Sequence, residues 1–225
     1  MFKYETHLHT SRCSKCGGST GHEFVDTAKK MGYAGIVITN HFWGGNTCID
    51  KNIGWENFVK AYKEDYLDTL EYGLTQGVDV FFGLEDGIGG GKEILIYGVD
   101  PDDLIAHPEY LELPLKGKID LLHSLGGIVF QAHPFRDRCY IDEPDVQPDP
   151  TLFEGVEAFN QYNAEGENPK AFAYAEKYGL IAISGSDVHE VDGFGNCGIE
   201  FTEKPKDYAD LLAKIMQRDF TLLTK

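Results

Sequence analysis

The feature that most constrains the fold is a regular alternation of short apolar runs with longer amphipathic segments. Short apolar or alternating runs are typical of strands, whereas apolar residues at intervals of three and four are typical of helices. We expect strands over 2–8, 35–39, 78–84, 93–98, 127–133, 155–160, 180–184 and 221–223, and helices over 23–32, 55–74, 114–125, 167–178 and 205–217. Strands that alternate with helices along the whole chain predict a parallel α/β architecture.

The organisation of the 225 residues is that of one domain over 1–225, because neither a linker nor an internal repeat divides them. No apolar run approaches the roughly 20 residues that span a bilayer. The N-terminal residues lack the basic and apolar regions of a signal peptide. We therefore expect a cytoplasmic protein without a membrane partner; the sequence does not predict its oligomeric state.

The charge balance limits the partners. Twenty basic and 37 acidic residues give a net charge of -17. Such a surface repels long polyanions, so we expect no long nucleic acid as a partner. A small anionic substrate remains compatible wherever bound cations reverse the local field. The odd number of cysteines, five, argues against a disulfide framework, although Cys13 and Cys16 form a CxxC pair that leaves a redox role open.

Polar side chains gather where the expected strands end. They are His7, His9, Asn40, His41, Glu85, His133, Asp187 and His189. In parallel barrels the carboxyl ends of the strands converge on one face, and catalysis takes place there. This convergence, more than any single residue, indicates a functional site.

Several of these residues have the chemistry of metal ligands. His7 and His9 are two apart on a strand, so both imidazoles point to the same side and suit a divalent cation, unless they are a chance pair. Asp187 and His189 repeat that spacing in a turn that could instead be simply solvated. Glu85 could bridge two cations or be an ordinary loop glutamate.

His41 and His133 each follow a buried strand, where an imidazole without a partner would be costly. A satisfied core histidine is the alternative for both. Other catalytic motifs are absent: the run Gly87–Glu93 lacks the spacing of a Walker A loop, and no GxSxG sequence occurs.

Six segments, taken in order, resemble the PHP family, which is named for a domain shared by some DNA polymerases and histidinol phosphatases. They are HLHT (7–10), ITNH (38–41), GLE (83–85), EILIYG (93–98), QAHP (131–134) and SGSDVH (184–189), and they cover nearly the whole chain. The resemblance implies a PHP-like distorted (β/α)7 barrel with two to three divalent ions, Zn, Mn or Fe, at its C-terminal face.

The resemblance also implies a ligand set. His7, His9, Glu85 and Asp187 correspond to the ligands of one ion, His133 and the bridging Glu85 to those of a second, and His41 and His189 to those of a third. Three positions depart from the family pattern. Asn40 replaces an aspartate, Glu93 replaces a histidine and remains an acceptable ligand, and Cys16 aligns with a ligand position of the third ion.

The expected activity is hydrolysis of a small phosphate ester, a phosphomonoester above all, by a metal-activated water. Asp187 or His189 would manage the proton of the leaving group. Arg136, three residues after His133, is expected to clamp the phosphate, with Arg12 and Arg138 as weaker candidates and a surface arginine as the alternative for each.

Two other functions remain open at this stage. One is an amidohydrolase, whose barrels also begin with HxH and end with a strand-terminal aspartate. The other is a metal-binding module without activity. The sequence names neither the substrate nor the metal.

Overall fold

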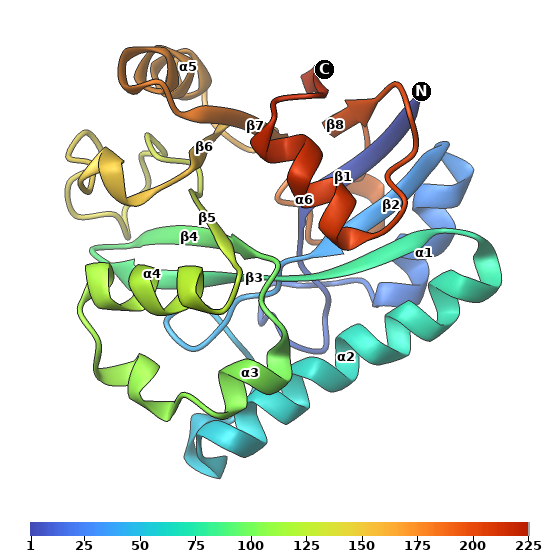
Figure 1. Ribbon diagram of the computed structural model, residues 1–225, viewed down its shortest axis with the longest axis horizontal. Helices are drawn as coiled ribbons and strands as arrows, with labels where there is room; N and C mark the ends of the chain where they lie inside the picture. Colours follow the sequence, from blue (N-terminus) through green and yellow to red (C-terminus); the bar gives the residue numbers. More distant parts are fainter. Residues whose placement is uncertain (225) are drawn as a thin grey trace.

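The computed structural model describes residues 1–224. Its strands form one sheet in the order β7-β6-β5-β4-β3-β2-β1-β8-β9 (Figure 1). The strands are β1 (Phe2–Leu8), β2 (Tyr33–Ile38), β3 (Asp79–Gly89), β4 (Lys92–Tyr97), β5 (Ile128–Gln131), β6 (Gly155–Asn160), β7 (Ile181–Gly185), β8 (Cys197–Phe201) and β9 (Thr221–Thr224). The helices are α1 (Gly21–Lys30), α2 (Trp55–Gln76), α3 (Pro101–Ile105), α4 (Leu115–Ser124), α5 (Glu167–Tyr178) and α6 (Tyr208–Met216), with short 3-10 turns η1 (Lys51–Ile53), η2 (Pro108–Glu112), η3 (Pro150–Leu152) and η4 (Val191–Gly193).

The sheet curls until β7 returns to β1. Leu8 and Val188 form a parallel bridge, and the His9 amide donates to the Val188 carbonyl at 2.8 Å. The Thr6 hydroxyl also donates to the Ser184 carbonyl at 2.7 Å. The result is a nearly closed, barrel-like sheet, which confirms the predicted α/β barrel.

The strand directions are mixed, and this corrects the expectation of a parallel sheet. β1 to β3 run parallel, as do β5 to β7, but β4 is antiparallel to both of its neighbours, β8 is antiparallel to β1, and β9 to β8. The reason at β4 is local. Only Gly90 and Gly91, both with positive φ, separate β3 from β4, and so short a connection can join only antiparallel strands.

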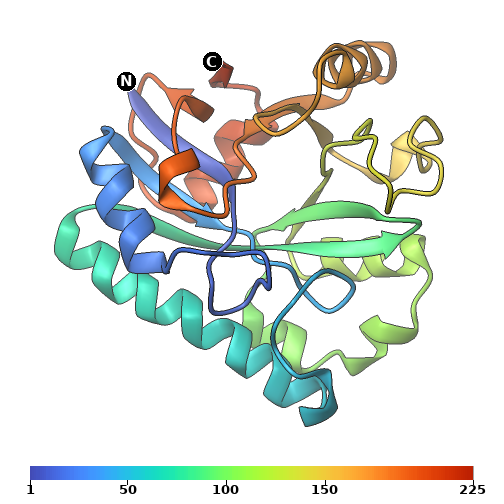
Figure 2. The same ribbon diagram turned by 180° about the vertical axis from the view of Figure 1, so that it is seen from behind.

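α1, α2, α4 and α5 cover the outer side of the sheet (Figures 1 and 2). α6 instead packs Leu211 and Ile215 against the inner side, where they join Leu95 and Tyr97 of β4. A capping box between Thr20 and Glu23 starts α1, which buries Phe24 and Ala28. α1 packs against β2 and α2, α2 against β3, α4 against β5, and α5 against β6 and β7. The predicted helices and strands all occur, with shifted ends, whereas β8 and α3, five residues each, were not predicted.

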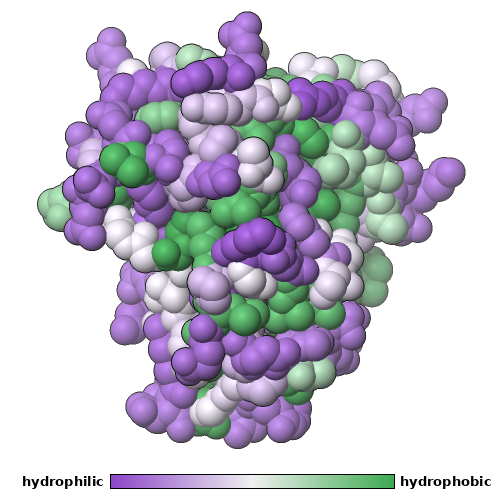
Figure 3. Space-filling view, turned by 60° about the vertical axis from the view of Figure 1, so that its left-hand side comes forward, coloured by the Kyte–Doolittle hydropathy of each residue, from purple (hydrophilic) through white to green (hydrophobic). Residues whose placement is uncertain are grey.

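The loop predicted over 134–150 is present and contains no helix or strand until η3. It follows β5, so it lies beside the strand ends where the polar residues gather. None of the helices within residues 1–224 has both the length and the apolar character needed to cross a membrane. The face seen in Figure 3 is mostly hydrophilic at its edges, with hydrophobic residues gathered toward the middle.

Candidate metal centre

The strand-end residues meet in one cluster. Three sets of side chains each bring one ligand atom per residue within 4.8 Å of one another: His7, His9 and Glu85; His41, Glu85 and Glu93; and His9, His41 and His189. The sets share members, so they form one continuous group. A cavity of about 480 Å³ opens onto it and is also lined by Cys16, His133, Arg136 and Asp187.

The first set is fully buried and tightly spaced. His7 Nε2 lies 3.0 Å from His9 Nε2 and 3.2 Å from Glu85 Oε1. Asp187 Oδ1 lies 3.4 Å from His7 Nε2 and 3.1 Å from His9 Nε2. Two ligands that are each about 2.1 Å from one ion lie roughly 3.0 Å apart at a right angle and roughly 3.4 Å apart at a tetrahedral angle. The spacing therefore suits the ligand sphere of one cation.

Glu85 connects this set to the second. Its Oε1 is 3.1 Å from His133 Nε2, and its Oε2 is 2.8 Å from His41 Nδ1. Glu93 faces the same two imidazoles, with Oε1 3.3 Å from His41 Nδ1 and Oε2 3.5 Å from His133 Nε2. One carboxylate thus reaches the ring nitrogens of both groups, which is the arrangement a bridging ligand requires.

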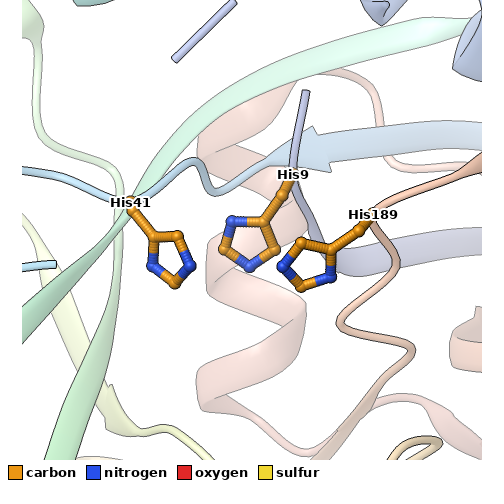
Figure 4. A group of neighbouring side chains, drawn as sticks. All are labelled: His9, His41 and His189. Carbon is orange, nitrogen blue, oxygen red and sulfur yellow. The ribbon is translucent and has the colours of Figure 1, made fainter. Parts of the chain in front are cut away.

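The third set is a group of three imidazoles that face one another (Figure 4). The His9 ring centroid lies 4.3 Å from that of His41 and 4.4 Å from that of His189. His189 Nδ1 donates to the backbone carbonyl of Asp187 at 2.8 Å, because a carbonyl can only accept. That bond fixes the His189 tautomer and leaves Nε2 with a lone pair for a cation.

Buried atoms without hydrogen-bond partners support a cation at this place. Within residues 1–224, His41 Nδ1 and Glu85 Oε2 are buried and form no hydrogen bond, although they lie 2.8 Å apart. Such atoms normally carry a large free-energy penalty unless an ion or water satisfies them. Imidazole and carboxylate donors together suit first-row divalent ions.

The pKa values reflect the crowding. Burial, and next the charge of His41, lower the pKa of His9 to about 3, so its ring is neutral and able to ligate. Burial alone would lower the pKa of His7, but Glu157, Asp187 and Glu85 raise it well above its usual range. Burial would raise the pKa of Glu85, yet His7 and His41 hold it well below normal. The Glu85 carboxylate is therefore ionised and attracts cations.

Cys16 lies at the open side of the third set and is exposed. Burial of part of the thiol would raise its pKa, but hydrogen bonds with His189 and His41 lower it to about 6. Most of the thiol is then ionised at neutral pH, the form that binds metals. Cys13 is buried and not bonded to Cys16, and the cysteines are all free thiols across residues 1–224.

Two of the predicted ligands have strained backbones. His133 has a φ of 26° and Asp187 a φ of 55°, in the region that favours glycine. Residues held in this region are concentrated at functional sites, where the surrounding structure holds them in place. Here the strain turns both side chains toward the cluster at the ends of β5 and β7.

The sequence reasoning missed the residues that support the imidazoles. Glu157, on β6, has Oε1 2.8 Å from His7 Nδ1, and its Oε2 accepts from the His133 amide at 3.0 Å. The signal was available, since an acidic residue within a buried strand is rarely left without a partner. The Ser14 hydroxyl, 3.2 Å from His9 Nδ1, had no such signal in the sequence.

Asn40 holds the scaffold behind the cluster. Its Oδ1 accepts from the Ser14 hydroxyl at 3.0 Å and from the Thr10 amide at 2.6 Å, and its Nδ2 donates to Asp65 at 3.0 Å. The Asn40 side chain thus keeps the hydrogen-bonding capacity expected of it. The carboxylate buried beside it is that of Asp65, on α2.

Arg136 lies at the edge of the cluster and is buried. Its Nη1 lies 2.7 Å from Asp187 Oδ2, and its Nη2 and Nε donate to Asn160 and Asn163. The other two arginines differ. Arg12 pairs with Asp68 on the exposed surface, while Arg138 lines a second cavity beside the site.

Comparisons with known proteins agree with the fold. A family model described as PHP-associated matches residues 165–220. The structure resembles a two-domain protein from Bacteroides vulgatus that contains a predicted PHP-like metal-dependent phosphoesterase, with a TM-score of 0.75 and 16% identity over 99% of this chain. The match covers 64% of that protein, so this chain spans somewhat less than two thirds of its length.

Two further structures share the fold at low identity. An amidohydrolase from Chromobacterium violaceum with bound sulfate has a TM-score of 0.59 and 14% identity, and 99% of each chain is covered. A lesion-specific endonuclease from Pyrococcus furiosus has a TM-score of 0.65 and 10% identity, with 98% of this chain and 57% of that chain covered. A comparison with curated proteins found no match.

These structures share the barrel-like α/β fold of this chain. The shared fold and the match of residues 165–220 to the PHP-associated model agree with the resemblance to the PHP family that the six motifs indicate.

Proposed function

We propose that this protein is a metal-dependent phosphoesterase that hydrolyses a small phosphate ester. The observation that carries the proposal is the set of three ligand groups, in which His9, His41 and Glu85 each belong to two groups. The guanidinium of Arg136 lies at the edge of these groups. A phosphomonoester is the simplest such substrate and the one that the sequence motifs favour. The structural neighbours named as a phosphoesterase and an endonuclease support phosphoester chemistry.

The residues divide naturally among two to three divalent ions. His7, His9, Glu85 and Asp187 would hold the first, His133 and Glu93 with Glu85 the second, and His41, His189 and Cys16 the third. This donor set fits Zn, Mn or Fe. When bound, the ions would supply acidity to water and would neutralise charge on the phosphate.

The chain's own side chains would orient the substrate. Arg136 is fixed by Asp187, Asn160 and Asn163, and these contacts use three of its five N–H groups. The remaining two can donate to phosphate oxygens. Because the guanidinium is already ordered, little side-chain entropy is lost on binding.

His189 and Asp187 are the candidates for moving the proton of the leaving group. His189 lies at the wall of the cavity with part of its ring exposed, and its Nδ1 proton is held by the Asp187 carbonyl. Burial opposes a rise in the pKa of His189, but Cys16 and Asp187 raise it nonetheless. When no ion occupies Nε2, the ring could take a proton there and deliver it to a departing alkoxide.

A small substrate fits the charge better than a long nucleic acid, since the net charge of -17 repels a polyanion. An amidohydrolase is the second candidate, because the Chromobacterium violaceum protein with the same fold carries that name. The bridging position is held here by Glu85 rather than by a lysine, which favours the phosphoesterase.

The test is turnover by protein loaded with Mn, Zn or Fe(II). We expect hydrolysis of p-nitrophenyl phosphate that disappears in the Glu85→Gln variant, and none of p-nitroacetanilide. Cleavage of the anilide alone would establish the amidohydrolase. Full metal occupancy without hydrolysis of any phosphate ester or amide would make the protein a metal-binding module.

A further inference from the structure

Two cavities meet at the candidate metal centre. The first, of about 480 Å³, contains the side chain of Tyr140 in its wall. The second, of about 350 Å³, has Tyr162, Arg138 and Gly193 in its wall. Arg136, Asp187 and His189 line both. A phosphate held by Arg136 at the cluster would therefore have an open space on each side.

The ring of Tyr162 is held in place beside Arg136. The amide oxygen of Asn160 accepts from the Tyr162 amide at 2.9 Å and from Arg136 Nη2 at 2.8 Å, so one group fixes both. Arg138 Nη2 donates to the Tyr162 carbonyl at 2.8 Å. The hydroxyl lies over Gly193, where an added Cβ would collide with it. The side chain is nevertheless 47% exposed.

Tyr140 lines the first cavity, as Tyr162 lines the second. Its carbonyl packs on Gly91, where an added Cβ would collide with it, and the Asp142 amide donates to the Gly90 carbonyl at 3.1 Å. These contacts fasten the loop 134–150, which carries Tyr140, to the turn between β3 and β4. The Tyr140 side chain is 56% exposed. Exposed tyrosines on a fixed backbone offer flat surfaces on which planar rings can stack.

We propose that the site takes a small phosphodiester with a planar ring on each side of the phosphorus, one against Tyr140 and one against Tyr162. This rests on the proposed phosphoester hydrolysis and extends it beyond monoesters. A monoester has a single organic substituent and would leave one cavity to water. In the diester reaction, water adds its oxygen to phosphorus and the P–O bond to one substituent breaks. That substituent leaves as an alcohol with a proton, and the other remains as a monoester.

The first test compares hydrolysis of bis(p-nitrophenyl) phosphate with that of p-nitrophenyl phosphate by metal-loaded protein. We expect the kcat/KM for the diester to exceed that for the monoester by at least about tenfold. Tyr162→Ala and Tyr140→Ala should each lower this ratio by at least about fivefold, the lower end of what ring stacking contributes. Tyr162→Phe and Tyr140→Phe should keep it.

Tyr178→Ala is the matched control, because Tyr178 is 44% exposed on α5 and lines neither cavity. It should leave both rates unchanged. Hydrolysis of the monoester alone, or alanine variants with an unchanged ratio, would overturn the diester proposal and leave the phosphoesterase standing. Absence of hydrolysis of both esters would overturn the phosphoesterase itself.

A binding measurement separates recognition from catalysis. Diphenylphosphinate carries two rings on phosphorus and phenylphosphonate carries one, and neither can be hydrolysed. Calorimetry on metal-loaded protein should show that Tyr162→Ala and Tyr140→Ala each weaken the binding of diphenylphosphinate at least about fivefold. At least one of the two variants should bind phenylphosphonate as tightly as the wild type does. If both variants affect the two ligands equally, the two cavities do not hold two rings.

Discussion

His7 Nδ1 lies 2.8 Å from Glu157 Oε1, while His7 Nε2 faces His9 Nε2 at 3.0 Å. His7 Nδ1–H therefore donates a hydrogen bond to the carboxylate, and the Nε2 lone pair points into the cluster. Glu157 also accepts from the His133 amide, so it supports imidazoles that belong to two of the proposed ion sites. Such supporting carboxylates orient metal-binding histidines and raise their basicity.

Replacing Glu157 by glutamine should weaken metal binding by roughly 10- to 100-fold, the range typical of such supporting residues. The side chain keeps its shape but loses the charge that fixes the His7 tautomer. Competition with a chromophoric chelator measures the affinity. Glu176→Gln, an exposed change on α5, is the control. If Glu157→Gln and Glu176→Gln bind the metal with equal affinity, Glu157 does not support the metal-binding histidines.

Glu85→Ala should remove more metal than His41→Ala. Glu85 faces His7 and His133 and would serve the first and second ions, whereas His41 would serve the third ion alone. We expect at least two divalent ions per chain in the wild type, fewer than one in Glu85→Ala and an intermediate content in His41→Ala. Elemental analysis after metal supplementation measures the number of ions per chain in each variant. Less than one ion in the wild type would contradict the multinuclear site.

The residues that could be predicted are those whose positions follow from strand periodicity. His7 and His9 share a face because they are two apart, and Glu85, His133 and Asp187 follow apolar runs that had to be buried strands. Their meeting at one edge follows from the topology of a barrel. The fold class was predictable for the same reason.

What could not be predicted depends on contacts between distant segments. Ser14 reaches His9 only because a loop folds back after β1, and no period encodes that. The parallel architecture expected from the alternation does not hold at β4, because the Gly90–Gly91 turn joins β3 and β4 as a hairpin. The positive φ of His133 and Asp187 is imposed by neighbouring strands rather than by residue type.

Cys16→Ser should lower occupancy of the third ion site without emptying the first two. Hydrogen bonds with His189 and His41 lower the pKa of the Cys16 thiol to about 6, so a thiolate is present at neutral pH. In Co(II)-substituted protein a sulfur-to-cobalt charge-transfer band should appear and vanish in Cys16→Ser. Cys48→Ser, at another exposed cysteine, should retain it. A band that survives Cys16→Ser excludes this thiol as a ligand.

Glu5 should make the metal-free protein less stable as the pH rises. Its Oε1 accepts from the amides of His7 and Ser186, each at 2.9 Å, but burial raises its pKa to about 7. The folded state then holds a proton that the unfolded state releases near pH 4.5. The stabilisation is complete below pH 4.5 and is lost as the pH rises through 7.

The Glu5→Gln variant cannot lose that proton. Relative to it, the wild-type free energy of unfolding should fall by about 3 kcal/mol between pH 4.5 and 8, since each unit of pKa difference corresponds to about 1.4 kcal/mol. Urea denaturation in the presence of a chelator measures the difference. Glu176→Gln should show no such trend. A difference that does not vary with pH would mean that Glu5 is ionised throughout.

Arg136→Ala should lower kcat/KM for a phosphate ester at least about tenfold while metal content stays intact. The guanidinium contacts Asp187 Oδ2, whereas Asp187 Oδ1 faces His7 and His9, so the ligand oxygen keeps its surroundings. A lost charge-assisted contact to the reacting phosphate costs on the order of 2 kcal/mol or more. Arg136→Lys should recover only part of the rate, because an ammonium cannot replace the forked donor. Arg12→Ala is the control, since Arg12 pairs with Asp68 and lines neither cavity. If Arg136→Ala turns over substrate as fast as Arg12→Ala, Arg136 only anchors Asp187 and the phosphate is held elsewhere.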